Sequence, residues 1–161
     1  MKEELLELLR KTEMPVPKKG KARLDNVERM VLGRVKMWFG KGFAESRHNK
    51  KYPELLAMLK EFVHTHDPKY VFDAVTVNKN HAIKKHVDKN NQDDSYIFGL
   101  GDYTGGELVF ESGPHEGTHN IKDKWLKFRG DHPHYVLPFK GERWSFVFYH
   151  WKEYLFFSRR D

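Results

Sequence analysis

The second half of the chain is a succession of short segments rich in aromatic and β-branched residues, separated by glycine, proline, asparagine and aspartate. Half-buried strands have this composition, and the separating residues are those that form turns. The pattern predicts seven strands, at residues 70–78, 82–88, 95–100, 107–110, 121–128, 134–139 and 143–151. Short strands at this spacing favour a β-sandwich or a jelly roll.

The first half of the chain adds helices to this sheet. Residues 2–11 place leucines on one helical face, and residues 52–65 repeat apolar side chains at helical spacing, with Pro53 in a position that suits a first turn. Residues 27–38 are predicted to form a further strand. We therefore expect an α+β, mainly β fold in which N-terminal helices support a sheet.

The chain of 161 residues is long enough for one domain with its own core. Because prolines and lysines follow the first helix, residues 1–24 are interpreted as a helical arm and basic tether, and residues 25–161 as a single domain. No apolar run approaches the roughly 20 residues of a membrane span, and the charged start is unlike a secretory signal. We expect an intracellular monomer, nuclear or cytoplasmic, without membrane association.

Charge and cysteine content narrow the chemistry. Without cysteine, the chain cannot form disulfides or thiolate metal sites, so that any metal must be held by His, Asp or Glu. The formal charge of +6 suits a polyanionic partner without requiring one. Residues 34–51 contain six Lys or Arg and one acid, which fits either a solvated loop or a phosphate-binding surface.

Two potential metal ligands, His86 and Asp88, stand two residues apart. Side chains at positions i and i+2 of a strand point to the same face, so that this pair can meet one ion. Two histidines and one carboxylate on one face of the metal are typical of non-haem iron oxygenases. Taken alone, however, the pair is close to the chance expectation for a chain of this composition.

Further candidates follow in the segment 128–143, which contains His132 and His134 and ends at Arg143. 2-Oxoglutarate chelates iron through its keto acid, and its far carboxylate needs a buried cation, for which arginine offers a bidentate fork. Arg143 lies nine residues after His134, across a turn. The alternative is a surface arginine beside a turn.

In this order, the residues resemble the Fe(II)- and 2-oxoglutarate-dependent oxygenases of the double-stranded β-helix fold, over residues 70–151. The matching segments are His86-x-Asp88, Gly105-Gly106-Glu107-Leu108, Pro133-His134-x-Val136-x-Pro138 and Gly141-x-Arg143. The resemblance implies a double-stranded β-helix, that is, a cupin-like jelly roll. It also implies that Fe(II) is bound by His86, Asp88 and His134, with His132 as a competing ligand whose spacing fits less well.

The segment 143–149, Arg-Trp-Ser-Phe-Val-Phe-Tyr, is similar in more detail to the ten-eleven translocation and base J (TET/JBP) DNA oxygenases. This similarity implies that Arg143 and Ser145 hold 2-oxoglutarate and that Tyr149 touches a flipped base. Asn91 stands three residues after the metal aspartate, as does a polar residue that contacts the base edge in that group. A flipped base is read by stacking and by hydrogen bonds to its pairing edge.

Alternative interpretations of these side chains remain open. Tyr149 alternates with phenylalanines and could belong to the core. Asn91 could be a turn residue without a role in binding. Asn78 could hydrogen-bond the cosubstrate or serve the end of a strand. The chain also departs from the TET/JBP pattern, since Trp151 stands where that group has a base-contacting histidine.

These residues predict an Fe(II)/2-oxoglutarate-dependent dioxygenase that uses molecular oxygen to oxidise the 5-methyl group of a pyrimidine, 5-methylcytosine, in DNA. One alternative is a protein hydroxylase of the prolyl type, which shares the iron and cosubstrate residues. Another is an inactive β-helix domain that binds nucleic acid. His115 and His119 have the spacing of a helical zinc site, but the glycines and proline around them predict a loop at 111–120.

Overall fold

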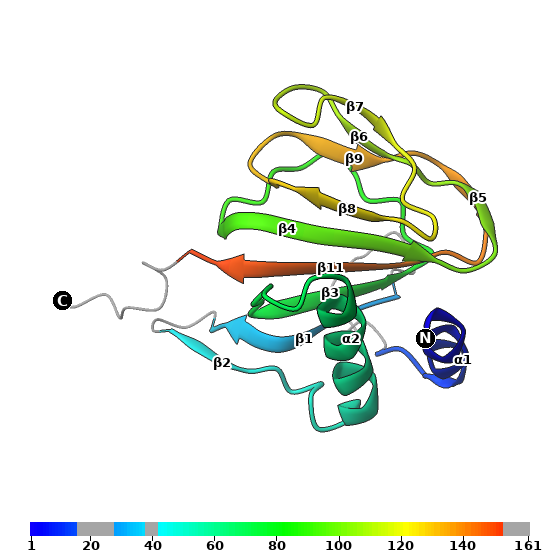
Figure 1. Cartoon of the computed structure of the whole chain (residues 1–161), viewed down its shortest axis with the longest axis vertical. Helices are drawn as coiled ribbons and strands as arrows, with labels where there is room; N and C mark the ends of the chain where they lie inside the picture. The colour runs from blue at the N-terminus through cyan, green and yellow to red at the C-terminus, as the bar shows by residue number, and fades with distance from the viewer. Residues whose placement is uncertain (16–27, 38–41, 153–161) are drawn as a thin grey trace, which may run out of the picture.

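The computed structural model describes residues 1–15, 28–37 and 42–152. Within these residues there are two helices, α1 (Lys2–Lys11) and α2 (Pro53–His66). Both lie on one side of a six-stranded antiparallel sheet, and shorter strands lie on its other side (Figure 1). The predicted α+β, mainly β jelly-roll fold is therefore confirmed.

The large sheet has the strand order β2-β1-β3-β11-β4-β8. Its strands are β1 (Glu28–Lys36), β2 (Phe43–Glu45), β3 (Ala74–Lys79), β4 (Asn91–Leu100), β8 (Trp125–Phe128) and β11 (Trp144–Trp151). A three-stranded sheet, β7-β6-β9, and the pair β10-β5 complete the fold. Their strands are β5 (Tyr103–Gly105), β6 (Leu108–Phe110), β7 (Gly117–His119), β9 (His134–Val136) and β10 (Phe139–Gly141).

Strand β11 divides the interior of the protein into two parts. Its even-numbered residues from Trp144 to Phe148 are fully buried on the helix side, in the same core as Leu5 of α1. Its odd-numbered residues from Ser145 to Tyr149 line a cavity on the other side. Because successive side chains of a strand point to opposite faces, one strand contributes both to the main core and to the cavity wall.

The predicted strand at 82–88 is wrong. This segment forms no regular strand: it makes an isolated antiparallel bridge between His86 and His134, and single backbone hydrogen bonds join Ile83 to Val136 and Asp88 to Gly130. The exposed side chains of Lys84 and Lys85 precede the bridge. The segment is therefore irregular chain that is held to β9 by a few separate hydrogen bonds and does not continue the ladder.

Other differences concern short elements. The helices predicted at 2–11 and 52–65 are confirmed to within one residue. The loop predicted at 111–120 contains β7, and β2 and β5 were not predicted, because three residues are too few to produce a readable alternation. The basic tether and the domain boundary predicted at residue 24 lie outside the described residues. Neither described helix is long and apolar enough to span a membrane.

Candidate active site

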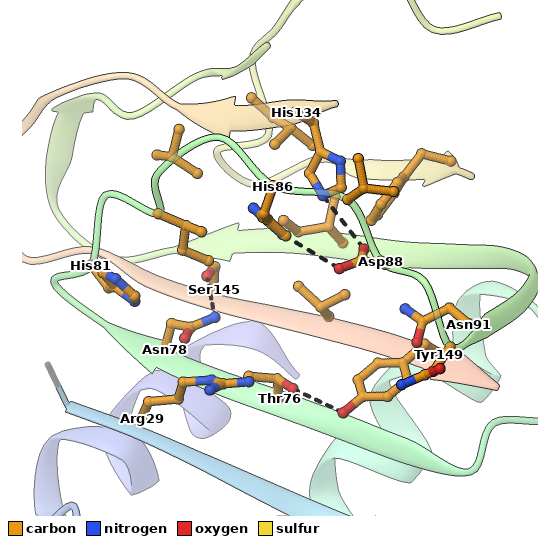
Figure 2. Close-up of a pocket in the computed structure, with 18 of the residues that line it drawn as sticks. Arg29, Thr76, Asn78, His81, His86, Asp88, Asn91, His134, Ser145 and Tyr149 are labelled. Atoms are coloured by element: carbon orange, nitrogen blue, oxygen red, sulfur yellow. Dashed lines mark hydrogen bonds and ion pairs between the residues drawn. The ribbon is translucent and has the colours of Figure 1, made fainter. Parts of the chain in front are cut away.

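His86, Asp88 and His134 bring one potential ligand atom each to within 4.8 Å of one another. The backbone N–H of each histidine donates to the carbonyl oxygen of the other at 3.0 Å, and this bridge places the ring centroids 4.2 Å apart. The two oxygens of the Asp88 carboxylate lie 3.4 Å from Nε2 of His86 and 3.4 Å from Nε2 of His134 (Figure 2). Two imidazoles and one carboxylate thus converge on one point.

Both imidazoles are held in place through their other ring nitrogen. Nδ1 of His86 lies 2.8 Å from the carbonyl oxygen of Lys84, and Nδ1 of His134 lies 2.8 Å from that of His132. Because a carbonyl oxygen can only accept, Nδ1 of each ring carries a proton, and Nε2 can offer its lone pair to a metal once it gives up the proton that it donates to Asp88. His132, the competing ligand in the sequence, contributes its backbone and is not part of the cluster.

Asp88 is positioned by the close approach of Gly130. The N–H of Asp88 donates to the carbonyl oxygen of Gly130 at 2.8 Å. A Cβ atom on residue 130 would lie 2.8 Å from the Cβ atom of Asp88, so that a larger residue there would displace the carboxylate. Burial by itself would raise the pKa of Asp88, but hydrogen bonds from His134 and His86 lower it to about 2. The carboxylate is therefore ionised at neutral pH and available as a ligand.

The cluster opens onto a cavity of about 520 Å³ between the large sheet and the three-stranded sheet. In Figure 2, Asn78, Ser145 and His81 gather at one end of the cavity, and Tyr149 and Asn91 lie at the other. His86, Asp88 and His134 lie across the cavity from the large sheet, which forms its floor. One cavity thus joins a polar end and an aromatic end beside the histidine–aspartate–histidine cluster.

The first end of the cavity is polar and consists of cross-strand neighbours. Arg29 of β1 lies opposite Asn78 of β3, which lies opposite Ser145 of β11. Nδ2 of Asn78 lies 3.4 Å from Oγ of Ser145, whereas the buried Oδ1 of Asn78 has no hydrogen-bond partner. The guanidinium of Arg29 makes no hydrogen bond or ion pair with any described residue. A cation without a described partner at this end suits an anionic ligand.

Arg143 lies beyond this polar end and is not itself among the residues that line the cavity. It is 1% exposed, and its guanidinium donates to the carbonyl oxygens of Gly106 at 3.1 Å and of His81 at 3.4 Å. Burial lowers the pKa of Arg143. Its buried Nε has no partner, and no carboxylate of a described residue forms an ion pair with it. Because a buried unpaired charge is costly, this is a favourable place for an anion from outside the chain.

The second end of the cavity is aromatic. Tyr149 is 7% exposed, and its hydroxyl lies 3.2 Å from the hydroxyl of Thr76. Asn91 begins β4, opposite Trp151 in the register with β11, and both line the cavity. Asn91 is therefore a strand residue at the cavity mouth. Tyr149 is buried, as a core residue would be, yet it faces the cavity.

Two cavity residues, Arg29 and Thr76, were not found by sequence reasoning. Thr76 lies two residues before Asn78 on the same strand face, and this spacing was the available signal. Arg29 lies at the cavity because β1 pairs with β3, which sets Arg29 opposite Asn78. The sequence contains no local signal for this pairing. His115 and His119 belong to no cluster of three potential metal ligands among the described residues, and Nε2 of His119 lies 2.6 Å from the carbonyl oxygen of His115.

No family model matches the chain, and no curated protein matches its sequence. Solved structures do match it. NgTET1 in complex with 5mC DNA has a TM-score of 0.66 and 14% identity, over 93% of this chain and 67% of that one. An oxidoreductase of the 2OG-Fe(II) oxygenase family from Burkholderia pseudomallei has a TM-score of 0.57 and 20% identity, over 91% and 77% of the two chains.

A prolyl-4-hydroxylase from Pseudomonas putida has a TM-score of 0.50 and 14% identity, over 93% of this chain and 83% of that one. One of these structures contains 5mC DNA and another is a prolyl-4-hydroxylase, so the feature that the matches share with this chain is the scaffold. The chain therefore has the jelly-roll fold of the 2-oxoglutarate- and Fe(II)-dependent oxygenases, with a histidine–aspartate–histidine cluster facing its internal cavity.

Proposed function

We propose that the protein is an Fe(II)- and 2-oxoglutarate-dependent dioxygenase that oxidises the 5-methyl group of a pyrimidine, 5-methylcytosine, in DNA. The observation that carries this proposal is the convergence of His86, Asp88 and His134 on one point inside a cavity of an oxygenase fold. Two imidazoles and a carboxylate are a donor set that Fe(II) accepts while its other positions stay open. The described residues therefore fit the metal.

The iron would be held through Nε2 of His86, Nε2 of His134 and the carboxylate of Asp88. When bound, Fe(II) would activate oxygen and 2-oxoglutarate would supply two electrons through its decarboxylation to succinate and carbon dioxide. The protein keeps the ligands oriented through the carbonyl oxygens of Lys84 and His132. No rearrangement of the histidine rings is then needed before the metal binds.

The cosubstrate would occupy the polar end of the cavity. Arg143 is buried without a counter-ion among the described residues, and a carboxylate of 2-oxoglutarate would provide one. Ser145 and Asn78 would add hydrogen bonds, since both are buried at this end and the Ser145 hydroxyl and the Nδ2 group of Asn78 can donate to a carboxylate. Arg29 is the second cation available to the cosubstrate.

The target base would enter the aromatic end. Tyr149 would stack on the base, and Asn91 would hydrogen-bond its edge, as is usual for a base that leaves the duplex. The contact of Thr76 with the Tyr149 hydroxyl would hold the ring in place. The similarity to the fold of a protein solved with 5mC DNA and the positive net charge of the chain support DNA as the substrate.

The test is incubation of the protein with Fe(II), 2-oxoglutarate and DNA containing 5-methylcytosine, followed by mass spectrometry for succinate and oxidised bases. Both products are expected, in similar amounts, and His86→Ala should abolish both. Full activity of that variant would overturn the metal site. Turnover of a proline-containing peptide but not of DNA would favour a prolyl-type hydroxylase. DNA binding without any succinate would favour the inactive domain.

A further inference from the structure

Aromatic side chains continue from the cavity to the protein surface. The ring centroid of Trp151 lies 5.3 Å from that of Tyr149 and 5.4 Å from that of Phe43. The guanidinium carbon of Arg34 lies 5.8 Å from the centroid of the Phe43 ring. Tyr149 is buried, whereas Trp151 and Phe43 are half-buried. These four residues, Tyr149, Trp151, Phe43 and Arg34, form a continuous row that we call the mouth row.

Trp151 is fixed at the centre of the mouth row. Its indole N–H donates to the carbonyl oxygen of Arg34 at 2.9 Å, and its backbone N–H donates to the carboxylate of Asp73 at 2.9 Å. The same carboxylate lies 3.6 Å from the guanidinium of Arg34. Because the only polar group of the Trp151 side chain is already bonded, that side chain can offer a ligand its ring but no hydrogen bond. The mouth row is thus suited to stacking.

The surroundings of the mouth row are basic. Lys36 on β1 and Lys89 at the cavity are exposed, and the backbone N–H of Lys152 donates to the Asn90 carbonyl at 2.8 Å, which places this lysine beside the same edge. A neighbouring acid, Glu45, accepts a hydrogen bond from Asn49 at 2.7 Å. Cations beside aromatic rings are the combination with which proteins bind unpaired nucleic-acid strands.

We propose that the outer part of the mouth row, Trp151 and Phe43, stacks the nucleotide next to the target base, so that the protein takes its substrate from an unpaired DNA strand. This inference rests on the proposed function. In a duplex, a neighbouring base could reach Trp151 only if a second base pair opened, which adds to the cost of flipping the target. An unpaired strand carries no such cost, and every base has a face that can stack. The preference should therefore depend little on the identity of the neighbour.

Binding of a fluorescein-labelled oligonucleotide with one 5-methylcytosine, measured by anisotropy without iron or cosubstrate, tests the mouth row separately from oxidation. The single strand and its duplex are compared on the full chain and on two variants of Phe43, which does not line the cavity. Phe43→Leu keeps an apolar side chain but loses the ring, whereas Phe43→Trp keeps a stacking face. Both change an edge strand of three residues, β2, so that the fold should tolerate them.

The single strand should bind about tenfold more tightly than the duplex. Phe43→Leu should weaken single-strand binding by about tenfold, within the range measured for loss of one stacked base, and should leave duplex binding nearly unchanged. Phe43→Trp should retain the affinity of the unaltered protein. This pattern would separate stacking from general attraction by the basic residues, because both variants have the same charge.

Equal or tighter binding of the duplex would overturn the inference, and so would an unchanged single-strand affinity of Phe43→Leu. If duplex DNA were nevertheless oxidised, the proposed function would stand without the mouth row. Failure to bind either form of DNA, together with turnover of a peptide, would overturn the proposed substrate and the inference with it.

Discussion

The two walls of the cavity are held together in different ways. The floor belongs to the large sheet, in which β11 pairs with β3 without interruption from Trp144 to Tyr149. The opposite wall carries Asp88 on an irregular segment, which is held by the bridge between His86 and His134 and by single hydrogen bonds at Ile83 and Asp88. The floor is thus held by the hydrogen bonds of the sheet. A bound metal would add cross-links to the opposite wall, which carries His86, Asp88 and His134 and which we call the ligand wall. We therefore expect stability and metal affinity to respond to different substitutions.

The largest effect is expected for Asp88→Ala. Loss of the carboxylate should reduce succinate formation below detection, because two histidines alone leave the metal poorly held. The free energy of unfolding should change by less than about 1 kcal/mol, since the floor is untouched. Mass spectrometry and urea unfolding measure the two quantities. A large loss of stability would show that the ligand wall and the floor form one cooperative unit.

Phe146→Ala is the opposite case, a change in the floor on the helix side. Phe146 is fully buried, so the variant should lose about 3–5 kcal/mol of unfolding free energy. Urea unfolding measures the loss, and calorimetry with Mn(II) at low temperature measures metal affinity in the protein that stays folded. We expect that affinity to remain within about threefold of the unaltered protein, inside the usual limit for independent sites. A larger change would break the separation of the two walls.

Arg143→Gln tests the polar end of the floor. Hydrogen bonds to charged groups contribute about 1.5–3 kcal/mol, so that the dissociation constant for 2-oxoglutarate should rise about tenfold or more. The free energy of unfolding should not fall, because the substitution removes a buried charge without a counter-ion. Calorimetry in the presence of Mn(II) measures the affinity. Arg29→Gln is the comparison, with a smaller expected effect because this side chain is exposed. The reverse order would reassign the main cosubstrate contact to Arg29.

The smallest effect is expected for Gly130→Ala in the ligand wall. The added Cβ should push Asp88 out of line and weaken metal binding about tenfold, the lower end of the range for residues that support ligands. Asp131→Ala changes the next residue, which is exposed, and serves as the control. Equal metal affinity of Gly130→Ala and the unaltered protein would show that the chain around residue 130 shifts to make room for the Cβ atom without displacing the Asp88 carboxylate.

Elements with a long periodic pattern could be predicted from the sequence. Helix α2 follows from apolar residues at helical spacing, and β11 follows from its alternation between aromatic and smaller residues. The segment 82–88 was predicted as a strand because local pattern cannot show whether a partner strand exists. Its backbone hydrogen bonds run to residues that are distant in the sequence, Gly130, His134 and Val136.

The candidate site divides along the same line. His86, Asp88 and His134 were expected together because their order matches a family pattern, and the structure brings them to one point. Arg29 and Thr76 were missed because their place at the cavity follows from pairing between strands. The register of a strand depends on the sheet as a whole, so that its cross-strand partners cannot be identified from the residues next to it in the sequence.

The alternation of β11 also bears on how this protein can change over generations. Its even-numbered residues hold the helix-side core, whereas its odd-numbered residues from Ser145 to Tyr149 line the cavity. A substitution at an odd position can therefore alter what the cavity accepts while the core keeps its packing. An insertion or deletion of one residue would exchange the two faces and lose both at once. The ligand that the cavity accepts can therefore change through single substitutions in this strand, but not through a one-residue change in its length.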